Sequence, residues 1–424
     1  MKRFFTILLL LFSVSTFAQD TLRVMHYNLL YYGKTIQWCT EVTNPVWIKD
    51  NSLAKIIKYV KPDIFTANEI KADDSVHKHI LDNVLNIDGV AYYRKGAMTD
   101  NSSSNLSNGL FYNSNKLVLL SQHSIPTTVR DINFYNFYYK GIDIGTTKDT
   151  AYLTCIVMHL KAGNTTSDAT ERADQVNILM NYLDSQNKKA NYLVMGDFNV
   201  YNGNEACFQN LVNHSNANVR FFDPVNMIGA WDNNAAYAAY HTQSTHGSYS
   251  NGCHATGGMD DRFDFILQSE KIKDGTDHYK YLSGTYKAIG QDGNHFNDSI
   301  NSETNNSAPW DIINSLYTMS DHLPVKMDIL VDQAHKTDNT IIFDSIFPNP
   351  VTTDLYINLN TEPHLKLEFD IINLFGKVVH TYYAETTGTS SFFDFPVGFL
   401  KQGFYLLRIS DGKYKPVTRK FVKK

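Results

Sequence analysis

The chain has 424 residues, with 43 acidic and 38 basic side chains and a formal net charge of -5. This length exceeds what one ordinary domain needs, so we expect two domains. The mild negative charge gives no sign of a basic surface that coats nucleic acid. An acidic chain can still cut a polyanion where metal ions and local cations offset the repulsion.

The first 18 residues have the pattern of a secretory signal peptide. Lys2 and Arg3 precede an apolar stretch, and Thr16-Phe17-Ala18 forms a small-x-small cleavage site. A transmembrane anchor would need about 20 consecutive apolar residues, and Ser13 and Ser15 interrupt this stretch. We therefore expect an exported, soluble protein without a transmembrane segment in its mature chain.

The apolar pattern of the mature chain predicts strands and helices in mixed order. Strands are expected at 22–30, 64–70, 109–112, 117–121, 134–140, 152–159, from 193 onward, and at 263–267. Helices are expected at 51–60 and 170–183. Because strands often follow strands directly, mixed sheets are favoured over strict βαβ alternation.

Four cysteines are too few for a disulfide scaffold. Cys155 lies in an apolar strand and Cys207 in an expected helix, whereas Cys39 and Cys253 lie in polar loops. An oxidising compartment would allow Cys39 and Cys253 to pair. The sequence alone leaves this pairing open.

Polar side chains with catalytic or metal-binding chemistry stand at the ends of the expected strands. They are Asn28, Glu69, His159, Asp197 with Asn199, Asp264, and Asp321 with His322. Residues i and i+2 of an extended segment point to the same side, so Asp197 and Asn199 can face one ligand. Each residue alone has a structural explanation, such as a buried histidine, an Arg262–Asp264 ion pair or a turn at 320–322. Together they are the set that phosphate ester hydrolysis requires: carboxylates for a divalent metal, a base for water, and donors to phosphoryl oxygens.

The order of these motifs resembles the endonuclease/exonuclease/phosphatase family. The matching segments are Asn28, Asn68-Glu69, His159-Leu160-Lys161-Ala162-Gly163, Gly196-Asp197-Phe198-Asn199, Asp261-Arg262-Phe263-Asp264-Phe265-Ile266 and Ser320-Asp321-His322-Leu323-Pro324-Val325. The resemblance covers residues 21–331 and implies an α/β fold, a two-sheet, four-layer α/β sandwich of mostly antiparallel strands. Asn68 departs from the glutamine usual in the family, a change that should not affect the chemistry.

The resemblance implies a metal site and a divalent cofactor. Glu69 would be the main ligand of Mg²⁺, with Mn²⁺ as the alternative ion. Asn28 and Asp321 would complete or orient the metal shell.

The resemblance also implies roles around the scissile phosphate. Asp264 would hold His322 in its tautomer, and His322 and His159 would contact the phosphate. Asp197 would position or deprotonate the attacking water, and Asn199 would donate to a phosphate oxygen.

The segment 231–259 is rich in Ser, Gly, Asn and His. A zinc site built from His241, His246, Cys253 and His254 would not match the spacing of common zinc motifs. A long loop that shapes substrate access, directly before the Asp264 strand, is the favoured interpretation.

The pattern changes after residue 331. A polar linker at 332–340 precedes short alternating strands with Gly and Pro punctuation, which predict a small all-β sandwich at 341–424. On physical grounds alone this could be a carbohydrate-binding or adhesive module. The Pro348-Asn349-Pro350 start, the Gly376-Lys377-Val378 hairpin, the Gly403-Phe404-Tyr405 strand and the basic end resemble the C-terminal sorting domain of the type IX secretion system of Bacteroidota. The resemblance implies export through the outer membrane by that machinery, with the tail removed or replaced by a surface anchor.

We thus expect a signal peptide at 1–18, a catalytic domain at 19–331, a linker at 332–340 and a sorting domain at 341–424. The leading hypothesis is a secreted, metal-dependent phosphodiesterase, an endonuclease that hydrolyses extracellular DNA or RNA. The alternatives are a phosphatase or sphingomyelinase-like phosphodiesterase, which His159-Leu160-Lys161-Ala162 resembles equally well, and a catalytically silent surface-binding protein.

Overall fold

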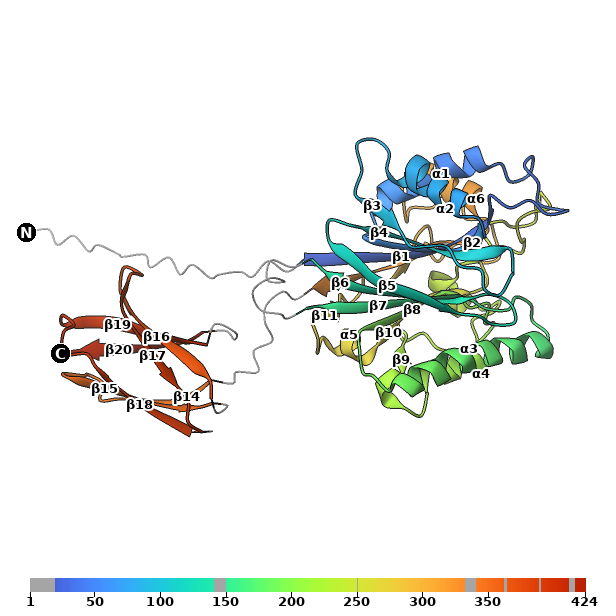
Figure 1. Cartoon of the computed structure of the whole chain (residues 1–424). Helices are drawn as coiled ribbons and strands as arrows, with labels where there is room; N and C mark the ends of the chain where they lie inside the picture. Colours follow the sequence, from blue (N-terminus) through green and yellow to red (C-terminus); the bar gives the residue numbers. More distant parts are fainter. Residues whose placement is uncertain are drawn as a thin grey trace, which may run out of the picture. The chain divides into compact units, whose positions relative to one another are not determined.

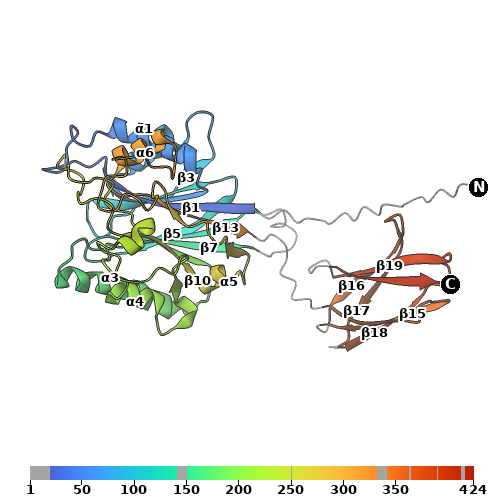
Figure 2. The same cartoon turned by 180° about the vertical axis from the view of Figure 1, so that it is seen from behind.

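The computed structural model describes residues 20–140, 150–249, 251–331, 341–361, 364–388, 390–411 and 416–424. The expected signal peptide at 1–18 and linker at 332–340 lie outside the described residues. The chain divides into two compact units, 1–333 and 334–424, which Figures 1 and 2 show from opposite sides.

The first unit is built on two sheets packed face to face (Figure 1). The first sheet has the order β11-β13-β1-β2-β4-β3, with β12 also paired to β13, and the second has the order β5-β6-β7-β8-β10-β9. The strands are β1 (Asp20–Tyr32), β2 (Ile64–Lys71), β3 (Tyr93–Lys95), β4 (Leu106–Asn113), β5 (Leu117–Ile125), β6 (Ile132–Tyr139), β7 (Tyr152–His159), β8 (Tyr192–Asp197), β9 (Phe221–Phe222), β10 (Asp264–Ser269), β11 (Tyr279–Tyr281), β12 (Lys287–Ala288) and β13 (Val325–Val331). Among these described strands, only β1 with β2 and β7 with β8 pair in parallel.

Helices cover the outer face of each sheet, which completes the expected four layers (Figure 1). The first sheet carries α1 (Val46–Val60), α2 (Asp74–Ile80) with a π-helical turn at Leu81–Leu85, and α6 (Trp310–Met319). The second carries α3 (Thr166–Gln186) and α4 (Ala206–Val212), while the short α5 (Glu270–Asp274) follows β10. Helix α3 begins four residues before its expected start, because Thr165 and Asp168 form a capping box there.

The side chains of strand β8 alternate between two hydrophobic cores. Leu193 and Met195 face the core between the sheets, whereas Tyr192 and Val194 pack under α3 and α4. Because successive strand side chains point to opposite faces, Asp197 continues the row of Leu193 and Met195. It therefore faces the space between the two sheets.

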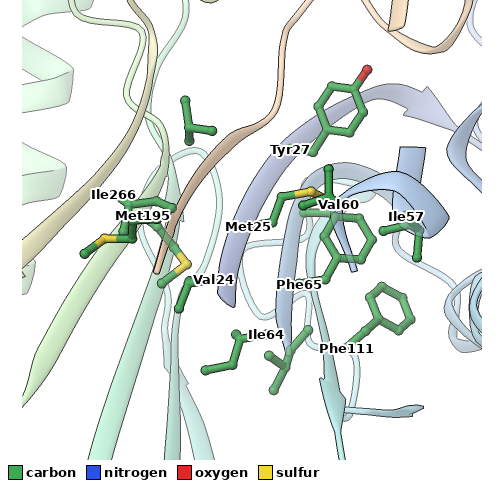
Figure 3. Packing of buried hydrophobic residues seen from close by; sticks show 14 of the residues in the cluster. Val24, Met25, Tyr27, Ile57, Val60, Ile64, Phe65, Phe111, Met195 and Ile266 are labelled. Atoms are coloured by element: carbon green, nitrogen blue, oxygen red, sulfur yellow. The ribbon is translucent and has the colours of Figure 1, made fainter. Parts of the chain in front are cut away.

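The same alternation places polar side chains of the neighbouring strands. In Figure 3, Met195 and Ile266 lie on one side with Val24 and Ile64, while Phe65 faces helix α1. Asn28 follows Val24 by four residues and Asp264 precedes Ile266 by two, so both belong to the inter-sheet face. The packing of the core thus fixes the direction in which the candidate site residues point.

A β-bulge in the first sheet changes the direction of the Glu69 side chain. The β1–β2 ladder pairs Asn28 with Asn68 but then shifts to Tyr32 with Ile70. Leu30, Tyr31 and Glu69 have left-handed φ values of 43°, 50° and 59°. Such residues cost about 1–3 kcal/mol each and collect at functional sites.

The cysteines resolve as one disulfide and two buried thiols. Cys39 and Cys253 are bonded, with their Cα atoms 4.5 Å apart. Cys155 in β7 and Cys207 in α4 are free and buried. The disulfide ties the loop after β1 to the loop before β10.

The second unit is the expected small all-β sandwich. One sheet has the order β14-β15-β18 and the other β17-β16-β19-β20, and the described strands within each sheet pair antiparallel. The strands are β14 (Ile342–Phe347), β15 (Asp354–Asn360), β16 (Lys366–Asn373), β17 (Val378–Glu385), β18 (Ser390–Pro396), β19 (Gly403–Ser410) and β20 (Val417–Lys423). Its hydrophobic core is formed by its own residues, among them Val351, Phe369 and Phe421.

Candidate active site

Three candidate residues stand in one row across the second sheet. His159 is in register with Asp197 between the parallel strands β7 and β8, and Asp264 is opposite Asp197 between β8 and β10. All three side chains are buried. His159 Nε2 lies 3.4 Å from Asp197 Oδ2, so the row brings an imidazole and two carboxylates together.

The first sheet adds Asn28 and Glu69 to this row. Asn28 Nδ2 donates to Asp197 Oδ2 at 3.0 Å and to Glu69 Oε1 at 3.2 Å. Glu69 Oε1 lies 3.9 Å from His159 Nε2, and Glu69 Oε2 accepts from the Tyr31 amide at 3.1 Å. The amide of Asn28 therefore bridges the carboxylates of the two sheets.

His322 is held between Asp264 and Gln243. Its Nδ1 lies 2.7 Å from Asp264 Oδ2, and its Nε2 lies 2.7 Å from Gln243 Nε2. Arg262 does not compete for Asp264, because its guanidinium donates twice to the buried Asp223. The purely structural role considered for Asp264, an ion pair with Arg262, is thus wrong.

Asn199 and Asp321 lie at the edges of the site. The amide of Asn199, whose φ is 51°, donates to Leu160 O at 3.3 Å. Asp321 Oδ2 accepts from the Ala255 amide at 2.7 Å, while its buried Oδ1 has no hydrogen-bond partner among the described residues. Ser320 Oγ donates to Asn28 O and joins this segment to β1.

The buried charges shift the pKa values of three groups. Burial, together with the Asp264 and Glu69 charges, raises the pKa of Asp197 to about 7, against the opposing effect of His322. Burial and nearby Arg130 hold the pKa of His159 well below its usual range. Burial also lowers the pKa of His322, but the Asp264 and Asp197 carboxylates outweigh it, so that the pKa lies well above its usual value.

The site also contains Arg130, which the sequence analysis missed. Its Nη1 donates to Leu160 O at 3.3 Å, the same carbonyl that accepts from Asn199. Thr127 Oγ1 holds the backbone of this turn by donating to Arg130 O. No ion pair to Arg130 occurs among the described residues, so its remaining N–H groups are available to an anion. A single arginine in a loop carries no sequence pattern that could have marked it.

The residues of this cluster fit a divalent cation. Glu69, His159 and Asp197 each offer one ligand atom, and these atoms all lie within 4.8 Å of one another. Carboxylate oxygens are hard ligands of the kind that Mg²⁺ and Mn²⁺ take. Asp321, which the family resemblance places in the metal shell, is not part of this three-residue group, although its unpaired Oδ1 remains a free acceptor.

The histidines of the segment 231–259 have other partners. His241 contacts the carbonyls of Trp231 and Met259, and His254 contacts the Asn251 amide and the Ala255 carbonyl. Within the described part of this segment, no metal-binding cluster forms.

Lys49 of helix α1 positions the backbone that carries Asn28 and Asp321. Its buried Nζ donates to Leu30 O at 2.9 Å, Met319 O at 2.7 Å and Asn44 Oδ1 at 2.9 Å. Burial lowers the pKa of Lys49 to about 7, against the pull of the Asp321 and Glu69 carboxylates.

Lys49→Met should therefore lower the free energy of unfolding, because it leaves the buried Met319 carbonyl without its donor, whereas Leu30 O keeps the Asn44 amide as its second donor. We expect a cost of about 1–3 kcal/mol for the orphaned acceptor, measured by urea denaturation. Lys55→Met, an exposed position on the same helix, is the control and should change little. Equal stability of the two variants would show that Lys49 holds nothing in place.

Comparison with known proteins gives two family matches. Residues 27–278 match the Endonuclease/Exonuclease/phosphatase family, and residues 345–424 match the Secretion system C-terminal sorting domain. No curated protein matches the chain. The first match stops before Asp321 and His322, yet the fold brings His322 to within 3.7 Å of Asp197.

Several solved structures resemble the chain. An endonuclease/exonuclease/phosphatase family protein from Bacteroides thetaiotaomicron is 15% identical with a TM-score of 0.45, over 75% of this chain and 98% of that one. The human Nocturnin catalytic domain with bound sulfate is 16% identical with a TM-score of 0.42, over 74% and 98%. D. rerio TDP2 complexed with a single-strand DNA product is 12% identical with a TM-score of 0.44, over 73% and 99%.

Because the first family match spans more than half of the chain, the protein belongs to the endonuclease/exonuclease/phosphatase family. It has the family's phosphodiesterase- or nuclease-like fold and carries a type IX sorting tail. The sorting tail indicates secretion to the cell surface or the extracellular space and implies the type IX machinery as a partner. In the described residues, no helix is long and apolar enough to cross a membrane.

Proposed function

We propose that the protein is a secreted, divalent-metal-dependent phosphodiesterase that hydrolyses extracellular nucleic acid. The observation that carries this proposal is the meeting of Glu69, His159 and Asp197 around one point, beside the His322–Asp264 pair. These residues come from both sheets, so the fold itself assembles them. Family membership supports the reaction class.

Each residue has a role in this proposal. Glu69, Asp197 and His159 would hold the metal, with Asn28 and Asp321 orienting its surroundings. A bound Mg²⁺ supplies charge neutralisation and polarises a phosphoryl oxygen. Beside the metal, the Asp197 carboxylate would also position the attacking water.

Side chains next to the Glu69, His159 and Asp197 cluster would donate hydrogen bonds to the phosphoryl oxygens. Asp264 holds His322 through Nδ1, and His322 Nε2, which lies 2.7 Å from Gln243 Nε2 and 3.7 Å from Asp197 Oδ2, would face the phosphate. Asn199 and Arg130 both donate to the Leu160 carbonyl, next to His159, and their other N–H groups would face the phosphate. Donors placed where negative charge develops are the main electrostatic aid to such a reaction.

The substrate class is tested by incubating the purified protein with plasmid DNA, RNA, sphingomyelin and inositol phosphates, with and without Mg²⁺. The proposal expects Mg²⁺-dependent cleavage of DNA or RNA. Cleavage of sphingomyelin or an inositol phosphate alone would select the alternative phosphodiesterase or phosphatase function. Failure to cleave any of the four would favour a surface-binding protein.

We further propose that the catalytic unit ends at residue 331 and folds without the tail, because each unit has a separate hydrophobic core. A chain truncated after the linker at 340 should keep its specific activity and melting temperature but no longer reach the cell surface. Activity assays, thermal melting and fractionation of the producing cells would check this. Joint loss of solubility and activity would mean that the two parts share a core.

A further inference from the structure

A pocket of about 250 Å³ adjoins the edge of the site. Its wall includes Leu30, two residues after Asn28, and Ser320, the residue before Asp321. Residues 42–45 and 48–49 on one side and parts of the 246–254 loop on the other complete it, and the Cys39–Cys253 disulfide joins these two sides. The pocket is therefore built on the same two segments that carry the candidate site residues.

Four aromatic side chains line this pocket. His246 and His254 stack with ring centroids 3.6 Å apart, and the Tyr317 ring lies 3.9 Å from His246. Tyr249 lies 6.4 Å from His254 and is 70% exposed. His246 and His254 are themselves buried, so the exposed Tyr249 and the half-buried Tyr317 are the rings that an occupant can reach. Nucleobases stack on accessible aromatic rings without need of a particular base.

The polar groups of the pocket indicate an uncharged occupant. No carboxylate is among its described lining residues. The Lys49 amine donates to three protein acceptors, and the Asn44 and Asn251 amides donate to backbone carbonyls. A quaternary ammonium group could face the aromatic rings, but it would lie beside Lys49 with no carboxylate to balance its charge. A flat, neutral ring fits better.

His246 also offers a hydrogen-bond acceptor. Thr245 Oγ1 donates to Ser320 O at 2.7 Å, so it accepts from His246 Nδ1–H at 2.9 Å. This tautomer leaves His246 Nε2 free to accept a hydrogen bond, as the amino or imino group of a base can supply.

We propose that this pocket binds the nucleobase attached next to the scissile phosphate, so that the substrates are phosphodiesters of nucleotides. The inference rests on the proposed function and adds the part of the substrate that the protein recognises. Residues 246–249 and 251–254, with the Cys39–Cys253 disulfide, thus select the substrate, while the strand ends carry out hydrolysis.

Four chromogenic esters test the pocket on the full chain with Mg²⁺. They are thymidine 5′-(p-nitrophenyl phosphate), its 3′ isomer, methyl p-nitrophenyl phosphate and p-nitrophenyl phosphorylcholine. All release p-nitrophenolate, so they differ only in the second group esterified to the phosphate. We expect kcat/KM for at least one thymidine ester to exceed that for the methyl ester by about 10-fold or more, the scale of base stacking.

Thr318→Trp should plug the pocket from its rim, where Thr318 is an exposed lining residue of α6. The matched control is Thr170→Trp on α3, because each threonine is exposed and donates to the carbonyl four residues earlier. The thymidine-to-methyl ratio of kcat/KM should fall toward unity in Thr318→Trp and stay unchanged in Thr170→Trp. Tyr249→Ala, which removes an exposed ring, should lower the same ratio.

Equal kcat/KM for the thymidine and methyl esters, an unchanged ratio in Thr318→Trp, or a preference for the choline ester would overturn the pocket assignment. If no ester is hydrolysed, the proposed function fails separately. Calorimetric binding of thymidine 5′-monophosphate then decides about the pocket. Binding that Thr318→Trp weakens and Thr170→Trp does not would support it, whereas no binding, or equal binding by both, would overturn it.

Discussion

Replacing His322 with alanine should lower kcat by about 10²–10⁴-fold, the range typical of losing a positioned proton-transfer group. The imidazole is buried, contacts Asp264 through Nδ1 and directs Nε2 toward Asp197 at 3.7 Å. Asp264→Ala should cost activity mainly through the same unit, because the Asp264 carboxylate holds His322 through Nδ1. The double variant should therefore be little worse than the worse single variant.

The measurement is kcat and KM for the two single variants and the double variant, with thermal melting beside them. His214→Ala is the matched control, because its Nε2 lies 2.9 Å from Asp184 in a similar pair of another part of the fold. It should retain full activity. Fully additive losses in Asp264→Ala and His322→Ala would show that the two residues do not work as a pair.

Glu69→Gln should reduce turnover by about 10²-fold or more and raise the Mg²⁺ concentration needed for half-maximal activity. The carboxylate would be the main metal ligand, and an amide of the same shape offers the ion no negative charge. The amide can still accept from the Tyr31 amide, as Glu69 Oε2 does, so the fold should persist. Raising Mg²⁺ should recover part of the loss.

Turnover titrated against Mg²⁺ checks this expectation. Glu303→Gln, at an exposed position, is the control and should leave both turnover and the Mg²⁺ requirement as they are. A Glu69→Gln variant with an unchanged Mg²⁺ midpoint would place the metal elsewhere.

The strand-end positions of the candidate residues could be predicted from sequence because strand periodicity is local. Once β8 is known to run into Asp197, alternation alone places that side chain with Met195 on the inter-sheet face. The register between strands could not be predicted in the same way. It decides that His159 and Asp264 both lie level with Asp197, and that a bulge turns Glu69 toward Asn28.

The site residues that come from loops could not be predicted from sequence periodicity. Gln243 and Arg130 reach the site from irregular segments, where no periodicity relates neighbouring side chains. The Cys39–Cys253 disulfide joins positions 214 residues apart, a pairing that only the fold could decide. Likewise, the ion-pair partner of Arg262 is Asp223, which lies 39 residues earlier in the chain.

The most direct test of metal-dependent hydrolysis at this site uses the unaltered protein. Protein freed of metal with EDTA is assayed for cleavage of DNA and RNA, first in excess chelator and then after Mg²⁺ or Mn²⁺ is added back. Without a cation, the carboxylates of Glu69 and Asp197 repel each other and the phosphate, so we predict no turnover in EDTA and recovery with either ion. Full turnover in excess EDTA would contradict the account.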